Sequence, residues 1–99
     1  MYIVNTTFLV VPAAQEQWLE MIGRDYIPLL RSGGMEDITF TRVISDERAE
    51  HFTFALMVGV GSMADYKRLT EEFLLHYAQA AKLLFGQEPL YFTTLLKKL

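Results

Sequence analysis

The 99-residue sequence predicts an α+β fold with the element order βαββαβ. Three observations predict it: runs rich in β-branched and aromatic residues, longer segments with apolar residues at spacings of three and four, and glycine or proline at the junctions between them. Hydrophobic residues make up 52% of the chain and aromatic residues 13%, a composition that excludes a disordered polypeptide. The length allows one domain, so we expect residues 1–99 to form a single unit.

The first predicted strand covers residues 2–11, whose β-branched and aromatic side chains suit a half-buried sheet. Pro12 follows, and proline fits the first turn of a helix because its missing N–H would have no partner there. The apolar spacing predicts a helix over residues 13–31. Pro28 lies inside that pattern, so we expect the helix to kink or end near Ile27, ahead of a glycine pair with positive φ.

Two further strands are expected to form a hairpin. Residues 37–44 make the first of them, the polar residues 45–50 connect, and residues 51–60 make the second. Alternation in the second of these strands is the clearest in the chain, which predicts one side packed against the helices. That side consists of Phe52, Phe54, Leu56, Val58 and Val60.

The second helix and the last strand complete the pattern. Ser62 followed by Asp65 resembles a capping box, and helical spacing continues to about Phe85, where Gly86 ends it. Residues 90–96 form the last strand. Because crossover connections are right-handed and short, few topologies remain. The simplest is the ferredoxin-like fold, a four-stranded antiparallel sheet in the order 4-1-3-2 with both helices on one face.

The second face of this sheet has no helix to cover it. Charged residues are absent from residues 2–11, 51–60 and 90–96, whereas a solvent-facing sheet normally carries them. We therefore expect a second copy of the chain to cover this face through a two-fold interface, giving a homodimer. Alternation assigns to this face Asn5, Thr7, Leu9, Thr39, Thr41, Val43, His51, Thr53, Ala55, Met57, Gly59, Tyr91, Thr93 and Leu95.

The stretches that carry a resemblance to a known family are spread over nearly the whole chain. They are Glu-Gln-Trp-Leu-Glu-Met at 16–21, Tyr-Ile-Pro-Leu-Leu at 26–30, Ser-Gly-Gly-Met at 32–35, the strand at 51–58, Asp-Tyr at 65–66 and Phe-Thr-Thr-Leu-Leu at 92–96. Together they resemble a small family described only as a domain of unknown function, within the dimeric α+β barrel superfamily. The resemblance implies two ferredoxin-like sheets that face each other, and it offers no catalytic residues to carry over.

Asn5, His51 and His76 are the candidate catalytic residues. The superfamily includes cofactor-independent monooxygenases and haem-degrading enzymes in which an Asn on the first strand positions substrate or oxygen, and Asn5 matches that location. His76 matches the second-helix histidine of the haem-degrading pattern, although the tryptophan of that pattern is missing. His51 is a candidate general base because histidine titrates near neutrality. The alternative for both histidines is a side chain at the protein surface.

Arg42, Tyr91 and Tyr26 are the candidate ligand-binding residues. Arg42 is the one charged residue in 38–44, and it either anchors an acidic group or discourages sheet aggregation at an edge. We expect a pocket either between the sheet and the helices or between the two facing sheets, and Tyr91 is a polar group on the last strand that is a candidate to line it. Tyr26 is expected in the core, with its hydroxyl in a hydrogen bond.

Several classes of function are disfavoured by composition. The chain has no cysteine, and its two histidines have no acidic ligand pair at a recognisable spacing, so we expect no metal and no cofactor. A net charge of -3 opposes nucleic-acid binding. No apolar run is long enough to span a bilayer, and the N-terminus lacks the basic region of a secretory signal, so we expect no membrane association and a cytoplasmic protein.

The sequence therefore predicts a homodimeric ferredoxin-like protein of uncharacterised function that binds a small, mostly apolar molecule. The alternative is a cofactor-independent monooxygenase or isomerase of the dimeric α+β barrel type, using Asn5 with His51 or His76. An enzyme site needs its polar groups to converge on one pocket, so the positions of these three side chains separate the two hypotheses.

Overall fold

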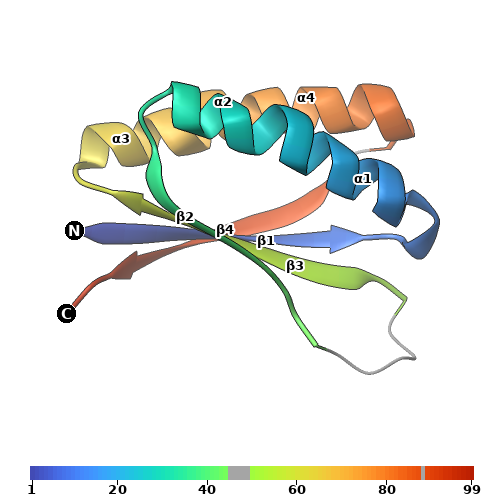
Figure 1. The fold of residues 1–99 in the computed structure, drawn as a ribbon, viewed down its shortest axis with the longest axis horizontal. Coiled ribbons are helices and arrows are strands. Elements are labelled where there is room, and N and C mark those ends of the chain that lie inside the picture. Colours follow the sequence, from blue (N-terminus) through green and yellow to red (C-terminus); the bar gives the residue numbers. More distant parts are fainter. Residues whose placement is uncertain (45–49, 88) are drawn as a thin grey trace.

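The sheet has the topology predicted from the sequence. The computed structural model describes residues 1–44, 50–87 and 89–99, and in these residues four strands form one antiparallel sheet in the order β2-β3-β1-β4 (Figure 1). Read from the other edge, this is the order 4-1-3-2. Residues 45–49 of the expected hairpin connection lie outside the described residues. The strands are β1 (Tyr2–Val10), β2 (Glu36–Arg42), β3 (Phe52–Val60) and β4 (Leu90–Lys97).

The first long helix runs without a break from Pro12 to Ser32. It consists of η1 (Pro12–Ala14), α1 (Gln15–Met21), the π-helical η2 (Ile22–Tyr26) and α2 (Ile27–Ser32). The helix therefore does not end near Ile27. Its preceding turn widens, so that the Ile27 N–H donates to the Ile22 carbonyl five residues back. The wider turn accommodates Pro28, because it relaxes the hydrogen-bond ladder at the point where proline has no N–H to donate.

Glycine closes this helix. Gly34 takes a φ of 85°, and the following Met35 N–H donates to the Leu30 carbonyl at 2.9 Å, which is the pattern of a Schellman cap. Only one of the two glycines supplies the expected positive φ, because Gly33 has a φ of -81°. Gly33 is needed for space instead: a Cβ at this position would overlap the ring of Phe73 on the neighbouring helix.

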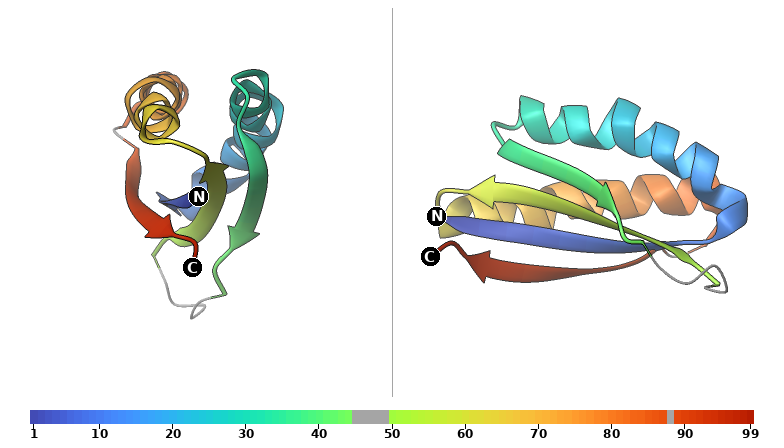
Figure 2. Two further views of the ribbon diagram at one scale, coloured as in Figure 1. Left: turned by 90° about the vertical axis from the view of Figure 1, so that its left-hand side faces the viewer. Right: turned by 60° about the horizontal axis from the view of Figure 1, so that its bottom comes forward.

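The second long helix consists of α3 (Met63–Lys67), the π-helical η3 (Arg68–Phe73) and α4 (Leu74–Phe85). The Ser62 Oγ accepts a hydrogen bond from the Asp65 N–H at 3.2 Å, which confirms the predicted cap. Gly86 ends the helix in the left-handed region, with a φ of 69°. Figure 2 shows the two long helices side by side in one layer on the same side of the sheet, with α4 above β4 and α2 above β2.

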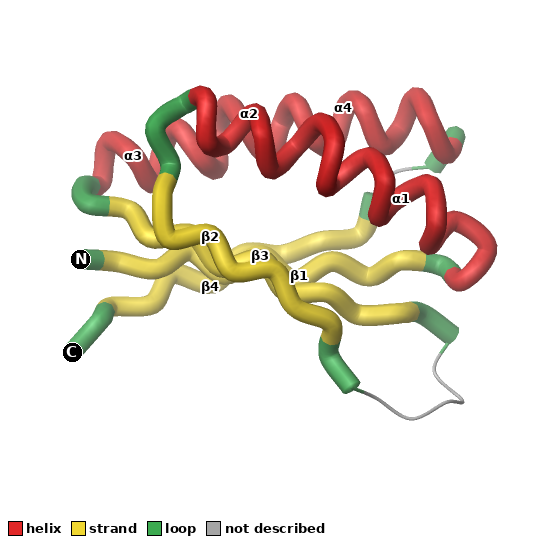
Figure 3. The backbone as a smooth tube through the Cα atoms, viewed as in Figure 1, coloured by secondary structure: helices red, strands yellow, loops and turns green. Residues whose placement is uncertain are grey.

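Figure 3 shows the helices stacked on one side of the sheet. The buried side chains of both form a single core cluster. Burial alternates along β1 and β3, so the side chains at every second position point toward the helices. The predicted helix-facing side of β3 is confirmed, since Phe54 to Val60 are buried at alternate positions and Phe52 packs against the same cluster. Within the described residues no helix is long and apolar enough to cross a membrane.

The face assigned to the last strand is wrong. Tyr91 pairs with Phe8, which is buried beneath the helices, so Tyr91, Thr93 and Leu95 lie on the helix side. The reason is that apolar residues occupy both parities of this edge strand, and its pairing with β1 decides which of them turn inward. The residues that take the uncovered face are Leu90, Phe92, Thr94 and Leu96.

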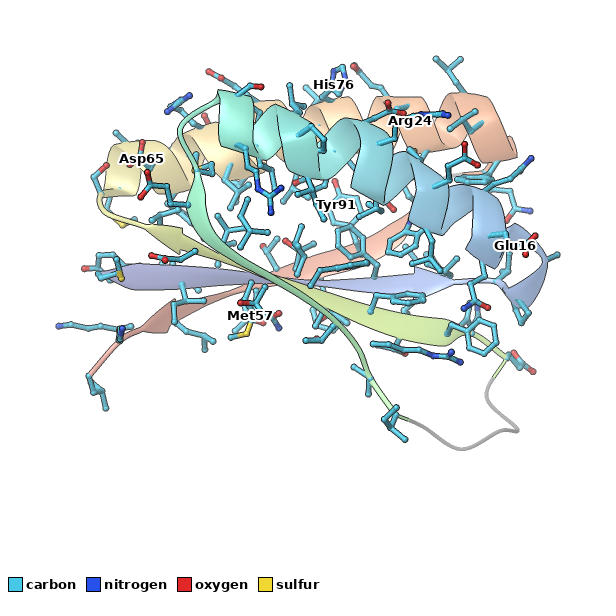
Figure 4. The ribbon with its side chains drawn as sticks, viewed as in Figure 1. Glu16, Arg24, Met57, Asp65, His76 and Tyr91 are labelled. Carbon is cyan, nitrogen blue, oxygen red and sulfur yellow. The ribbon has the colours of Figure 1, made fainter. Side chains whose placement is uncertain are left out.

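The uncovered side of the sheet is called the open face below. Among the described residues, its positions on β1, β3 and β4 carry no charged side chain, whereas Asp37 of β2 lies beside Gly59 at its edge. It is more apolar than the sequence predicted, because β4 contributes three large apolar residues to it. Figure 4 shows Met57 on this side, away from the helices. The open face consists of Ile3, Asn5, Thr7, Leu9, Thr39, Thr41, Val43, Thr53, Ala55, Met57, Gly59, Leu90, Phe92, Thr94 and Leu96.

Candidate functional site

A cavity of about 100 Å³ lies at one end of the sheet, where β1 finishes and β3 and β4 begin. Its walls come from that end of the sheet, from η1 and α1, and from the last turns of α4. It is partly open to solvent and mostly apolar, as small-molecule sites usually are. The lining residues are Leu9, Val10, Val11, Ala14, Trp18, His51, Tyr77, Ala81, Phe85, Gln87, Pro89 and Leu90.

A hydrogen-bonded aromatic pair forms the inner wall of the cavity. The Trp18 Nε1 of α1 donates to the Tyr77 Oη of α4 at 2.9 Å, and the two side chains are 2% and 3% exposed. The edge-on ring of Phe8 packs against both, with centroid separations of 5.3 and 5.0 Å. An indole N–H only donates, so burial of Trp18 requires an acceptor, and Tyr77 supplies it. The pair therefore links the two long helices above β1.

Two more tyrosines adjoin this wall. The rings of Tyr26 and Tyr91 lie 5.5 and 5.7 Å from the ring of Tyr77. The Tyr26 hydroxyl is buried and has no hydrogen-bond partner among the described residues, contrary to the expectation for it. Burial, with Tyr77 beside it, raises the pKa of Tyr26 well above its ordinary range. Burial also raises the pKa of Tyr77 to about 12, against the hydrogen bond from Trp18, which lowers it. Both phenols are therefore neutral at physiological pH.

His51 is the one predicted site residue that lines the cavity. It precedes β3 at the end of the sheet and is half-buried. Gln87, which follows the α4 cap, also lines the cavity and is exposed. Apart from the Trp18–Tyr77 pair, these are the two polar side chains among the described lining residues. Neither is a lysine or an arginine, so no permanently charged side chain is among the described lining residues.

Asn5, His76 and Arg42 lie elsewhere. Asn5 is on the open face, where its Oδ1 is buried without a partner among the described residues. His76 is exposed on the outer surface of α4, beyond the helical layer (Figure 4). Arg42 is exposed at the end of the edge strand β2, with its guanidinium 4.4 Å above the Phe52 ring. The structure therefore does not bring Asn5 together with either histidine.

Trp18, Tyr77 and Gln87 are the site residues that sequence reasoning did not single out. Their signal was present for the first two: each is an aromatic residue with a polar atom on the buried side of a helix, so each needs a partner. The sequence could not show that they partner one another across 59 positions. Gln87 sits in a short loop without a recognisable motif. Among the described residues, no group of three or more histidine, aspartate or glutamate side chains could hold a metal ion.

Comparison with known sequences places the chain in a family. The profile of DUF4286, a domain of unknown function, matches residues 1–99. The chain belongs to this family. No curated protein matches the chain in sequence. The family assignment therefore agrees with the resemblance seen in the sequence, and it leaves the activity to be argued from the site.

Solved structures share the fold of this DUF4286 chain. A dimeric ferredoxin-like protein from an uncultured marine organism superposes with a TM-score of 0.67 at 14% identity, over 99% of this chain and 95% of that one. A protein of the ethyl tert-butyl ether (EthD) family from Bacillus halodurans gives 0.65 at 13% identity, over 100% of both chains. A mutant of SnoaB, a cofactor-independent oxygenase from Streptomyces nogalater, gives 0.61 at 14%, over 98% and 92%. At these identities the likeness establishes the ferredoxin-like fold.

Proposed function

We propose that this chain is a homodimeric, cytoplasmic protein, one ferredoxin-like domain over residues 1–99, that binds a small and mostly apolar molecule. The observation that carries the proposal is the apolar cavity closed by the buried Trp18–Tyr77 pair. Engineered apolar cavities of roughly 150 Å³ bind benzene. A partly open cavity of about 100 Å³ suits a molecule of similar size.

The open face supports the homodimer. Phe92 is 56% exposed, and Val43, Leu90 and Leu96 are also exposed. Contiguous apolar patches of this kind are rare on monomers and mark sites of association. The β1, β3 and β4 positions of this face carry no charge among the described residues, so two copies can meet there across a two-fold axis without like-charge repulsion. The similar fold of a protein described as dimeric supports the same arrangement.

Dimerisation and ligand binding would share residues. Leu9 and Leu90 belong to the open face and also line the cavity. A partner chain on the open face would therefore cover one side of the cavity and reduce its exposure to water. In this arrangement the dimer completes the binding site as well as the shared core.

The oxygenase or isomerase alternative has less support. The fold of SnoaB is compatible with it. The chemistry, however, would need Asn5 and a histidine at one pocket, and these side chains occupy the open face, the cavity rim and the outer helix surface. The geometry therefore favours a binding protein over this enzyme mechanism.

Native mass spectrometry of freshly purified protein tests the proposal. We expect a species of twice the 11.4 kDa chain mass, carrying a small molecule that is released on gentle activation. Collection of the released molecule then gives its mass directly. A species of single-chain mass at micromolar concentration would contradict the dimer.

A further inference from the structure

The Tyr77 hydroxyl carries a proton that has no acceptor within the described part of the chain. Its oxygen accepts from the Trp18 indole N–H, which can only donate. The phenolic proton therefore has to point toward another oxygen or nitrogen. No protein acceptor is found for it in residues 1–44, 50–87 and 89–99. The Tyr77 hydroxyl, whose oxygen accepts from Trp18, is therefore an unsatisfied donor among the described residues.

The cavity adjoins Tyr77 and can hold an acceptor for this proton. Tyr77 and Trp18 both line the cavity, yet both are nearly inaccessible from outside. A buried donor without an acceptor destabilises the folded chain, and a ligand oxygen in the cavity would remove that penalty. Since burial raises the pKa of Tyr77 to about 12, the proton stays on the phenol at neutral pH.

The charge of the lining restricts the ligand further. No lysine or arginine is among the described lining residues, so a carboxylate or phosphate would be buried without a fixed countercharge. A neutral carbonyl oxygen satisfies the Tyr77 donor without that penalty. The rest of the ligand has to be apolar, because leucine, valine, alanine, phenylalanine and proline make most of the wall.

We infer that the Tyr77 hydroxyl recognises a neutral carbonyl compound, a ketone, aldehyde or quinone, by donating a hydrogen bond to its oxygen inside the cavity. This inference rests on the proposed function and names the class of ligand. Trp18 holds the phenol in the orientation that makes it a donor, so it acts as a positioning residue. The apolar wall selects for an uncharged body.

The test compares two probes of the same shape that differ in the oxygen, cyclohexanone and methylenecyclohexane. Trp18 is the only tryptophan, so its indole N–H gives a single signal in a ¹⁵N spectrum of the full chain. Cyclohexanone should move this signal downfield, because a Tyr77 hydroxyl that donates becomes a stronger acceptor for the indole. The ratio of the two dissociation constants should shift toward the hydrocarbon by about threefold to tenfold in Tyr77→Phe.

Two further variants keep the comparison decisive. Tyr26→Phe removes a buried hydroxyl that does not line the cavity, and it should leave the ratio unchanged. Trp18→Phe keeps the Tyr77 hydroxyl but removes the N–H that orients it, so the preference for the ketone, read from the backbone amide of Ala81, should be smaller than in the unmodified chain and larger than in Tyr77→Phe. An unchanged ratio in folded Tyr77→Phe would overturn the inference and leave the cavity as a binding site. Binding of neither probe at millimolar concentration would overturn the cavity itself, and the inference with it.

Discussion

Tyr26 and Tyr77 show how one hydroxyl group differs in value between two buried positions. Both side chains are 3% exposed and their rings are in contact, but only Tyr77 has a hydrogen-bond partner. The Tyr26 hydroxyl is buried and unpaired among the described residues. A polar group in that state reduces the stability of the fold, whereas the Tyr77 hydroxyl contributes to it by satisfying Trp18.

Substitution of each tyrosine by phenylalanine should therefore have opposite effects. Tyr26→Phe should raise the free energy of unfolding by about 1 kcal/mol, because it removes an unsatisfied group without creating a cavity. Tyr77→Phe should lower it by about 1–3 kcal/mol, because the Trp18 Nε1 loses its acceptor. Urea unfolding of the three proteins under one set of conditions measures both. Equal changes in the two variants would show that the Trp18–Tyr77 bond is not formed in solution.

The helices and strands could be predicted from sequence to different depths. Apolar spacing, Ser62 and Gly86 predicted the second helix to its last residue, because these signals are local. The face of β4 could not be predicted, because Tyr91 and Phe92 are both apolar enough to turn inward. The register with β1, a contact distant in sequence, decided it. Of the cavity lining, the sequence predicted His51, but it could not pair Trp18 with Tyr77, because these side chains meet only in the folded chain.

The close approach of the two long helices at Gly33 and Phe73 gives a prediction about how these elements pack. Gly33→Ala should lower the free energy of unfolding by about 1–3 kcal/mol, because its new methyl group overlaps the Phe73 ring, which has to leave its packing against the core. Gly23 is the control: it lies inside η2 of the same helix, and a Cβ there meets nothing within 4 Å. Gly23→Ala should stabilise by about 0.5–1 kcal/mol through helix propensity. Urea unfolding gives both values, and a neutral Gly33→Ala would contradict the packing described.

At the scale of the whole molecule, the chain is apolar beyond what its own core requires. The sheet packs one side under the helices and leaves the open face bare, with Leu90, Phe92 and Leu96 exposed along β4. Leu90, Phe92 and Leu96 stand on that face where the sequence predicted Tyr91, Thr93 and Leu95, so the face has more apolar surface for a partner to cover. The chain therefore has the properties of half an assembly, in which two sheets share a second core.

Light scattering coupled to size exclusion, applied to the unmodified chain and to Phe92→Glu and Leu75→Glu, tests this central claim most directly. Phe92 and Leu75 are similarly exposed, at 56% and 53%, but Leu75 lies on α4 away from the open face. We predict a dimer for the unmodified chain and for Leu75→Glu, and a folded monomer for Phe92→Glu, whose carboxylate would be buried unpaired at the interface. A dimeric Phe92→Glu, or a monomeric unmodified chain, would contradict the account.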